Sequence, residues 1–206
     1  MVTRFAQGIS YVLTPLVLPT AVLVLALINI GSQASDILAA GAIALTAFLL
    51  IPLADILWMI RRGKTTTIDV PERQSRTEVF ALTIVTASAA LLVNRTLVLP
   101  SSGLIDVILI TYTVNLILVM GVNLFWKVSV HMVTLSGSLA ILLIVSAISG
   151  ETSTILEASS IRPFLLLIPL VGWARFRLKA HTAAQIVVGA TLGFCGHWLV
   201  MLSLVG

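Results

Sequence analysis

The sequence predicts an all-α, polytopic membrane protein of about seven transmembrane helices. Of its 206 residues, 59% are hydrophobic and only 10% are charged, whereas a soluble domain carries roughly 25% charged residues. Its mean hydropathy is +1.13. Apolar stretches of the length needed to cross a bilayer, about 20 residues, recur along the whole chain. Such a chain has too few polar and charged residues to form the surface of a water-soluble protein.

Each apolar stretch is interpreted as a helix, because a chain segment in lipid must satisfy its own backbone hydrogen bonds. The first continues to Ile30 and is therefore read as a retained span, not a cleaved signal peptide. The sixth is short and contains Pro163 and Pro169. Together they leave no room for a soluble domain, so residues 1–206 are predicted to form one integral membrane domain. The predicted spans are Tyr11–Ile30, Ile37–Ile60, Glu78–Leu99, Leu104–Leu124, Met132–Ser149, Arg162–Trp173 and Thr182–Val205.

The basic residues are distributed unequally between the two sides of this topology. Only Arg95 and Arg162 fall on the side opposite to the amino terminus. The positive-inside rule therefore predicts a multi-pass protein of the cell membrane, with the amino terminus in the cytoplasm. The net charge of +4 is attributed to topology and lipid headgroups and not to nucleic acid. The amino-terminal side carries Arg4, Arg61, Arg62, Lys64, Arg73, Arg76, Lys127, Arg175, Arg177 and Lys179.

Three polar clusters lie at the edges of predicted spans on the basic side. The first occupies residues 69–76, where Arg73 and Arg76 are three residues apart and share a helical face. Two guanidinium groups on one face suit an anion such as phosphate. In the second cluster, Lys127, Ser129 and His131 could supply a charge, a hydrogen bond and a proton to one anionic group. Taken singly, each cluster is also consistent with an ordinary basic membrane edge.

The third cluster contains a histidine with a hydrogen-bonding partner one helical turn away. His181 opens the last span and Gln185 lies four residues later on the same face. A hydrogen bond to one ring nitrogen would fix the tautomer and free the other nitrogen to attack a substrate. Arg175 lies nearby and could hold the group under attack. Two membrane crossings separate each cluster from the next, so all three can meet at one face.

The order and spacing of these residues resemble the type 2 phosphatidic acid phosphatase superfamily. That family has a basic motif ending in Arg-Pro, then Pro-Ser-Gly-His, then Ser-Arg, five residues, His, three residues and Asp. Here Ser129-Val-His131 matches the second motif, and Arg175, five residues, His181, three residues and Gln185 match the third. The resemblance covers roughly residues 69–190.

The resemblance implies a membrane lipid phosphate phosphatase that works through a phosphohistidine. His181 would be the nucleophile and His131 would protonate the leaving lipid alcohol. Arg175 and Ser129 would bind the phosphate together with a basic residue of the first cluster, Arg73 or Arg76. The lipid stays open among phosphatidate, phosphatidylglycerophosphate and polyprenyl phosphates or diphosphates.

The chain departs from the family pattern in every motif. The first motif lacks the Arg-Pro pair, so Arg73 and Arg76 are assigned by position. Val128 and Val130 replace Pro and Gly, and Ala174 replaces Ser. Gln185 replaces Asp; a glutamine can orient an imidazole but cannot offset a positive charge on it.

The residue types also indicate which chemistries are not expected. The four aspartates are scattered, and the sequence has no His-Glu-x-x-His motif, no cysteine cluster and no glycine-rich phosphate loop. A mechanism without metal or cofactor is therefore predicted. The alternatives are a transporter or channel with a basic anion path, a haem protein using pairs among His131, His181 and His197, and a protein that only binds anionic lipid.

Several other polar residues are expected to have structural roles. Asn115 and Asn123 are expected to form interhelical hydrogen bonds. His197, about 24 Å beyond His181 along the same helix, is expected to be a packed interior histidine. Arg95 and Asp106 flank one connection on the less basic side and could pair across it.

Overall fold

The computed structural model describes residues 2–97, 99–150 and 161–206, and every regular element in those ranges is helical. The predicted all-α class is therefore confirmed. Helices α3, η1 and α4 follow one another without a gap and form one rod. The elements are α1 (Val2–Val12), α2 (Leu18–Asn29), α3 (Ala34–Ala44), η1 (Leu45–Leu50), α4 (Ile51–Arg61), α5 (Arg73–Thr96), α6 (Ser102–Phe125), α7 (Val130–Ser149), α8 (Arg162–Arg177) and α9 (Ala183–Val205).

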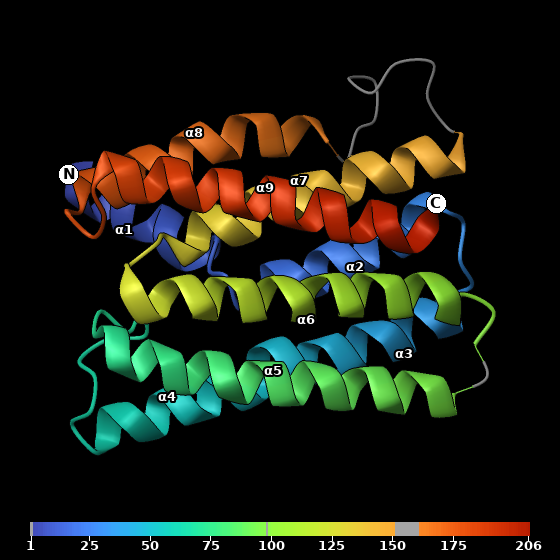
Figure 1. Cartoon of the computed structure of the whole chain (residues 1–206), viewed down its shortest axis with the longest axis horizontal. Helices are drawn as coiled ribbons and strands as arrows, with labels where there is room; N and C mark the ends of the chain where they lie inside the picture. Colours follow the sequence, from blue (N-terminus) through green and yellow to red (C-terminus); the bar gives the residue numbers. More distant parts are fainter. Residues whose placement is uncertain (1, 98, 151–160) are drawn as a thin grey trace.

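The rods lie side by side in a bundle, and the described connections between successive passes fall at its two ends (Figure 1). With α3–η1–α4 counted as one helix, five helices in the described ranges are long and apolar enough to cross a membrane. The shorter helices α1 and α2 follow each other along one further pass, and α8 makes another (Figure 1). This arrangement agrees with the predicted count of about seven passes and belongs to a multi-pass membrane protein.

The first predicted span, Tyr11–Ile30, is not one helix. Helix α1 begins much earlier, at Val2, and ends at Val12, while α2 begins at Leu18. Pro15 explains the break, because proline has no backbone N–H and disfavours the helical conformation in the residue before it. Pro19 lies in the first turn of α2, where the missing N–H costs no helical hydrogen bond.

A proline also shapes the second pass. Residues 45–50 form a π-helical turn, in which Ala47 would accept from the N–H of residue 52. Residue 52 is proline and has no N–H. The hydroxyl of Thr86 on α5 donates to the Ala47 carbonyl instead, at 2.8 Å. The carbonyl thus has a partner where no water is present to supply one.

Helix α7 lies at the centre of the bundle and packs most closely against α9. In the apolar stretch of 18 residues that would cross the membrane, 78% of the residues are buried. The close approach depends on glycines of α9: a Cβ at Gly193 would collide with the carbonyl of Val133, and one at Gly189 would lie 2.8 Å from the carbonyl of Ser129. Small residues allow two helix backbones to approach in this way.

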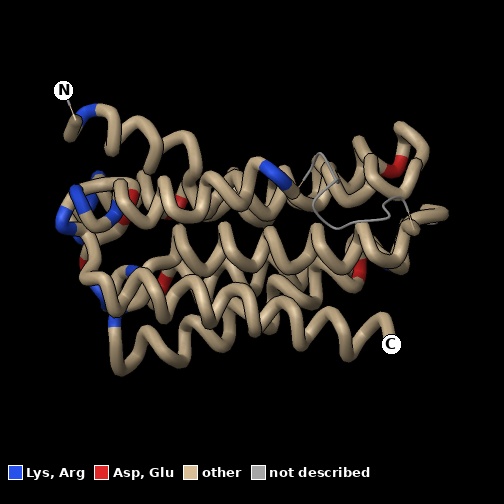
Figure 2. Tube along the Cα trace, turned by 90° about the horizontal axis from the view of Figure 1, so that it is seen from above, with Lys and Arg blue, Asp and Glu red and all other residues tan. Residues whose placement is uncertain are grey.

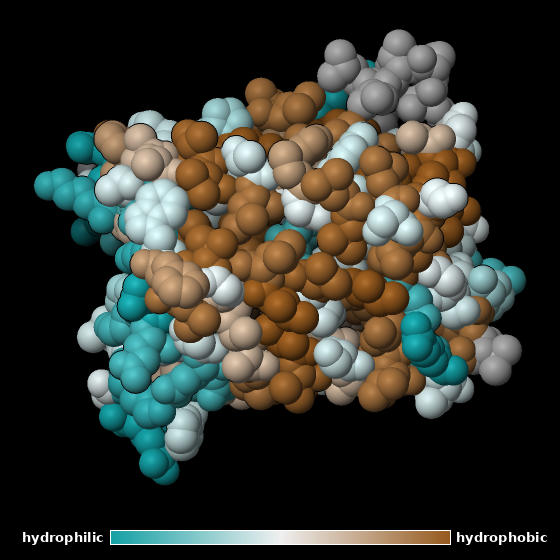
Figure 3. Space-filling view, in the orientation of Figure 1, coloured by the Kyte–Doolittle hydropathy of each residue, from teal (hydrophilic) through white to brown (hydrophobic). Residues whose placement is uncertain are grey.

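The surface is divided as in other membrane proteins. Most lysines and arginines gather at the end that holds the amino terminus (Figure 2), and an apolar belt covers the middle of the molecule (Figure 3). At the opposite end Arg95 Nε lies 2.9 Å from Asp106 Oδ2, which confirms the predicted pair. Asn123 of α6 donates to the Arg73 carbonyl and the Thr77 hydroxyl of α5, as expected of an interhelical bond.

Candidate functional site

The three polar clusters meet at the basic end of the bundle. The segment before α5, the start of α7 and the turn between α8 and α9 all lie there (Figure 1). Asp69 and Arg76 of the first cluster, His131 of the second and His181 of the third line one pocket. Residues that are far apart in sequence therefore share one cavity mouth.

His181 lies immediately before α9, in the turn that the helix cap organises. The Thr182 hydroxyl accepts from the Gln185 N–H at 3.3 Å, and the Gln185 side-chain oxygen accepts from the Thr182 N–H at 3.2 Å. This reciprocal pair is a capping box, which satisfies two otherwise free N–H groups. It also identifies which side-chain atom of Gln185 is the oxygen, because a backbone N–H needs an acceptor.

The same oxygen fixes the tautomer of His181. Gln185 Oε1 lies 3.2 Å from His181 Nδ1, and an amide oxygen can only accept, so Nδ1 carries the hydrogen. The lone pair of the neutral ring is then on Nε2. Burial, followed by the positive charges of Arg76 and Arg175, lowers the pKa of His181 to about 3. The ring is therefore neutral at physiological pH, which is the form that a nucleophile needs.

The start of α7 is tied to the start of α9 by backbone as well as by packing. The Ser129 N–H donates to the Gln185 carbonyl at 3.2 Å. The close packing at Gly189 permits this bond. The Ser129 hydroxyl is buried and has no hydrogen-bond partner among the described residues.

Asp69 is the carboxylate of the site. Its Oδ2 accepts from Arg175 Nη1 at 2.7 Å, and its Oδ1 lies 4.0 Å from His131 Nε2. Burial acts to raise the pKa of Asp69, but the charge of Arg175 and its hydrogen bond act against burial, and the pKa is lowered overall. Asp69 is therefore ionised at neutral pH and connects an arginine with a histidine of the site.

Two buried arginines supply positive charge. Arg76 donates from Nε to the Val70 carbonyl at 2.6 Å and from Nη1 to the Val128 carbonyl at 3.3 Å. Arg175 is 2% exposed, and its Nε has no hydrogen-bond partner within the described residues. Each guanidinium carries five N–H donors, so both retain donors for an anion.

His131 is also held by α1, at the same ring nitrogen that faces Asp69. Its Nε2 lies 3.2 Å from the Ser10 carbonyl oxygen, which can only accept a hydrogen bond. Nε2 therefore carries a hydrogen, and Nδ1 is the nitrogen left to exchange a proton. The amino-terminal helix, which the sequence interpretation left out of the site, thus sets the tautomer of one of its histidines.

Two non-glycine residues with positive φ lie beside the site residues. Val70 (φ 44°) follows Asp69, and Lys179 (φ 53°) lies two residues before His181. A β-branched residue such as valine is rarely found in this conformation. Strained backbone of this kind is often concentrated at functional sites. At Val70 the strain accompanies the carbonyl that accepts from Arg76.

The remaining residues singled out from the sequence occupy different places. Arg73 is exposed and donates to the Phe125 carbonyl at the end of α6, so it lies outside the pocket lining. Lys127 is partly buried near the arginines; burial and the charges of Arg76 and Arg175 lower its pKa. Arg175, Ser129 and Gln185 are not in the pocket lining but contact or neighbour residues that are.

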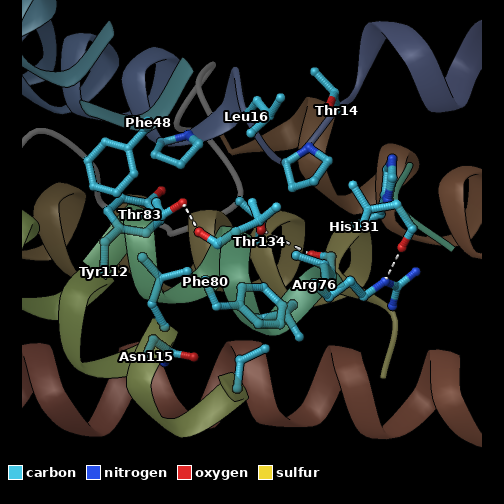
Figure 4. Close-up of a pocket in the computed structure, with 18 of the residues that line it drawn as sticks. Thr14, Leu16, Phe48, Arg76, Phe80, Thr83, Tyr112, Asn115, His131 and Thr134 are labelled. Carbon is cyan, nitrogen blue, oxygen red and sulfur yellow. Dashed lines mark hydrogen bonds between the residues drawn. The ribbon is translucent and has the colours of Figure 1, made fainter. Parts of the chain in front are cut away.

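The pocket continues from this polar mouth into the bundle (Figure 4). Its walls include the apolar Val79, Phe80 and Leu116, together with Thr83 and Thr134, whose hydroxyls donate to carbonyls of their own helices. The side chains around it come from α5, α6 and α7, from the turn before α2 and from η1. A polar mouth joined to an apolar interior matches an amphiphile with an anionic head.

Comparisons of this chain with models of known protein families, with curated proteins and with solved structures found no match. Among the described residues, no group of three or more histidines, cysteines, aspartates or glutamates could hold a metal ion. The chemistry of the pocket is therefore argued from its side-chain geometry and charge.

Two participants were missed from the sequence. Asp69 belonged to the first cluster but received no role, although an acidic residue in a basic segment just before Pro71 is a usable signal. The Ser10 carbonyl could not have been found, because a backbone contact over 121 positions leaves no mark on residue types.

Proposed function

We propose that this protein is a membrane lipid phosphate phosphatase that transfers the phosphoryl group to His181 and then to water. One observation carries the proposal: a neutral histidine with its tautomer fixed shares a pocket with a second histidine and a buried arginine, and that pocket continues into an apolar interior. The substrate is a lipid monophosphate or diphosphate. The mechanism assigns no role to a metal or cofactor.

In the first step, Nε2 of His181 attacks phosphorus. A P–N bond forms, the P–O bond to the leaving group breaks, and its electron pair departs on oxygen, which takes a proton from His131. In the second step, water attacks the phosphohistidine. A P–O bond forms, the P–N bond breaks, the water proton passes to His131, and inorganic phosphate leaves. General acid catalysis of this kind contributes about 10²–10⁴-fold.

The phosphoryl oxygens are held by the buried cations. Arg76 lines the pocket and keeps N–H groups for phosphoryl oxygens, whereas Arg175 and the unpartnered Ser129 hydroxyl lie behind the lining and would complete the site. Lys127 adds charge from the connection before α7. Fixed donors in a low-dielectric site stabilise charge that develops in the transition state.

Asp69 provides what Gln185 cannot. Gln185 orients the nucleophile without charge, whereas ionised Asp69 lies beside the proton donor His131. An adjacent carboxylate can stabilise the positive charge that an imidazole carries while it exchanges a proton. In this proposal Gln185 orients His181, and Asp69 supplies negative charge beside His131.

The proposed orientation places the basic end and the amino terminus in the cytoplasm of a cell, with the protein in the cell membrane. The asymmetry of the lysines and arginines supports it (Figure 2). The partners are the lipid phosphate substrate and the surrounding lipids.

A decisive experiment measures phosphate release from a panel of lipid phosphates in detergent with chelator present. The panel contains phosphatidate, phosphatidylglycerophosphate, and polyprenyl monophosphate and diphosphate. We expect release with at least one of them, and no release from His181→Ala. Arg177→Ala is the matched control, because Arg177 lies in the same segment, is exposed and is not part of the pocket.

Two results would contradict the proposal. Full activity of His181→Ala on every substrate would remove the covalent route, and activity that needs added magnesium would point to another mechanism. Binding of lipid phosphate without any release would favour the alternative of an anionic-lipid-binding protein. The presence of Gln185, where the phosphatase family has an aspartate, gives a chemical reason for such a loss of activity.

A further inference from the structure

The pocket has a second polar end inside the membrane. Tyr112 and Asn115 lie at the end opposite to Arg76 and His131 (Figure 4). His197 of α9 also lines the pocket, and its ring packs edge-on against that of Tyr112 with centroids 5.0 Å apart. The proposed phosphatase chemistry makes no use of these residues.

This end lies near the middle of the bilayer. Asn115 is ten residues from the end of α6 at Phe125, which corresponds to about 15 Å along the helix. His197 is fourteen residues from the start of α9, or about 21 Å. Half of a hydrocarbon core of about 30 Å is about 15 Å. A ligand whose head lies at the basic end would reach these residues only with its chain.

Asn115 was expected to hydrogen bond to another helix, but it does not. Its side chain is 1% exposed, and neither its amide oxygen nor its amide nitrogen has a hydrogen-bond partner within the described ranges. Its amide is held closely against α9, since a Cβ at Gly196 would collide with its nitrogen. An amide buried without hydrogen-bond partners is energetically unfavourable.

His197 has one satisfied and one free nitrogen. Nδ1 lies 2.8 Å from the Gly193 carbonyl, so Nδ1 carries the hydrogen and the lone pair of the neutral ring is on Nε2. Nε2 is buried and has no partner among the described residues. The position of the ring depends on Gly137 of α7, where a Cβ would collide with it.

The unpartnered atoms of Asn115 and His197 indicate which chemical group could hydrogen bond to both. Asn115 offers a donor and an acceptor, and His197 offers an acceptor. A hydroxyl group, which both donates and accepts, can satisfy both residues, whereas a carbonyl can only accept. A plain hydrocarbon chain would leave all three atoms without partners.

We infer that Asn115 and His197 form a binding site for a hydroxyl group on the hydrocarbon chain of the ligand. The cavity volume of about 110 Å³ is smaller than the apolar cavity of about 150 Å³ that holds one benzene-sized molecule, so a group that reaches this end must be slender. The phosphate at the head of this ligand rests on the proposed function, whereas the hydroxyl site rests on the unpartnered atoms. A water molecule has the same hydrogen-bonding chemistry, so the experiment must separate the two sources.

The test uses the full chain in detergent and hexadecyl phosphonate, whose C–P bond is not a phosphate ester. A series of the same lipid carries one hydroxyl at successive carbons, and calorimetry measures binding. We expect one mid-chain position to bind about tenfold more tightly than the plain chain, from one or two new hydrogen bonds. Asn115→Leu and His197→Phe should abolish this preference and retain or improve binding of the plain chain.

Two further variants support the reading of that result. Thr113→Val removes a hydroxyl from the same helix that is bonded to its own Leu109 carbonyl and is not part of the pocket, so it should keep the preference. Gly196→Ala should displace the Asn115 amide and reduce the preference. If Asn115→Leu fails to bind even the plain chain, Gly196→Ala and His197→Phe decide the question.

Equal affinity at every hydroxyl position in the wild-type protein would overturn the inference and leave water or simple packing as the role of this end. The binding measurement needs no turnover. A hydroxyl preference without phosphate release from any lipid phosphate would sustain this inference and refute the phosphatase; phosphate release without a preference would do the reverse.

Discussion

Gln185 takes part in two hydrogen-bond systems at once. Its side-chain oxygen completes the cap of α9 through the Thr182 N–H and also accepts from His181 Nδ1. The geometry of a helix start is thereby transmitted to the orientation of an imidazole. Because glutamine is neutral, this device fixes which nitrogen can attack without stabilising charge on the ring.

Substitutions of Gln185 test this role. Gln185→Leu removes the acceptor for Nδ1–H, so we expect kcat to fall about tenfold or more, the equivalent of about one hydrogen bond. Gln185→Asp restores an acceptor and adds a charge that stabilises the imidazole as it becomes positive, so activity should be kept or increased. Phosphate release from the preferred lipid measures both.

The control for Gln185 is Thr182→Ala. It breaks the other half of the capping box and lowers stability by about 1 kcal/mol, but it leaves the Gln185 oxygen in place. If Gln185→Leu is silent while His181→Ala is inactive, Gln185 is an ordinary helix residue.

A second prediction concerns pH. Burial and the neighbouring arginines hold the pKa of His181 at about 3, so its ring stays unprotonated well below the usual histidine pKa of about 6.5. Diethyl pyrocarbonate modifies only the neutral ring. We expect its rate at His181, followed by mass spectrometry and corrected for reagent hydrolysis, to stay constant from about pH 7 to about pH 5. A loss of tenfold or more would show an ordinary histidine.

A third prediction separates the two histidines by their leaving groups. His131→Ala removes the proton donor and should cost about 10²–10⁴-fold on a lipid phosphate, but less on an aryl phosphate with a good leaving group. Asp69→Asn should show the same pattern more weakly, because it removes the charge beside His131. Equal losses on both substrates would instead indicate that Asp69 only positions Arg175.

At the scale of elements, the site depends on how closely α7 and α9 approach each other. The Ser129 N–H reaches the Gln185 carbonyl between the two helix starts. The glycines of α9 permit this distance, and none of them touches the pocket mouth. Packing inside the membrane therefore sets the relative position of two polar clusters at its edge.

A fourth prediction follows for Gly193. Gly193→Ala places a methyl group against the Val133 carbonyl, so the helices must separate at a cost of about 1–3 kcal/mol. We expect a lower thermal unfolding temperature in detergent together with reduced phosphatase activity. Gly121→Ala on α6 is the control, because nothing lies within 4 Å of its added Cβ. Equal stability of the two variants would mean that the packing adjusts freely.

The elements also show what the sequence could predict. The helical class and the number of passes follow from apolar length, because lipid leaves the backbone no other partners. Helical spacing predicted the pairing of His181 with Gln185, but His181 lies before α9 and the contact forms in the helix cap. The exposed position of Arg73, the role of Asp69 and the contact from Ser10 do not follow, because each depends on how separate segments meet. Pro15 is a signal for a break, but the predicted span Tyr11–Ile30 runs through it because the apolar residues continue on both sides.

At the scale of the whole molecule, both membrane topology and the proposed phosphate binding would place basic residues at the amino-terminal end. Four of the basic residues there, Arg73, Arg76, Lys127 and Arg175, were assigned to phosphate binding and would bias any count of topology. Without them, six basic residues remain at the amino-terminal end against two at the other. The positive-inside rule counts basic residues in short connections and near the ends of spans.

The last prediction is therefore that the basic end faces the cytoplasm, and it is tested without relying on activity. Single cysteines are introduced at Lys64, at the basic end, and at Gly103, in the first turn of α6 at the opposite end, in a Cys195→Ser background. Thr152, in the predicted connection between the fifth and sixth spans, lies outside the described residues. A membrane-impermeant maleimide applied to intact cells should label Gly103→Cys and leave Lys64→Cys unlabelled until the cells are opened. Loss of the Lys64–Glu78 pair is tolerable, since exposed pairs contribute only about 0–1 kcal/mol. Labelling of Lys64→Cys from outside intact cells would reverse the topology and place the pocket mouth, with its proposed lipid phosphate, on the outer leaflet.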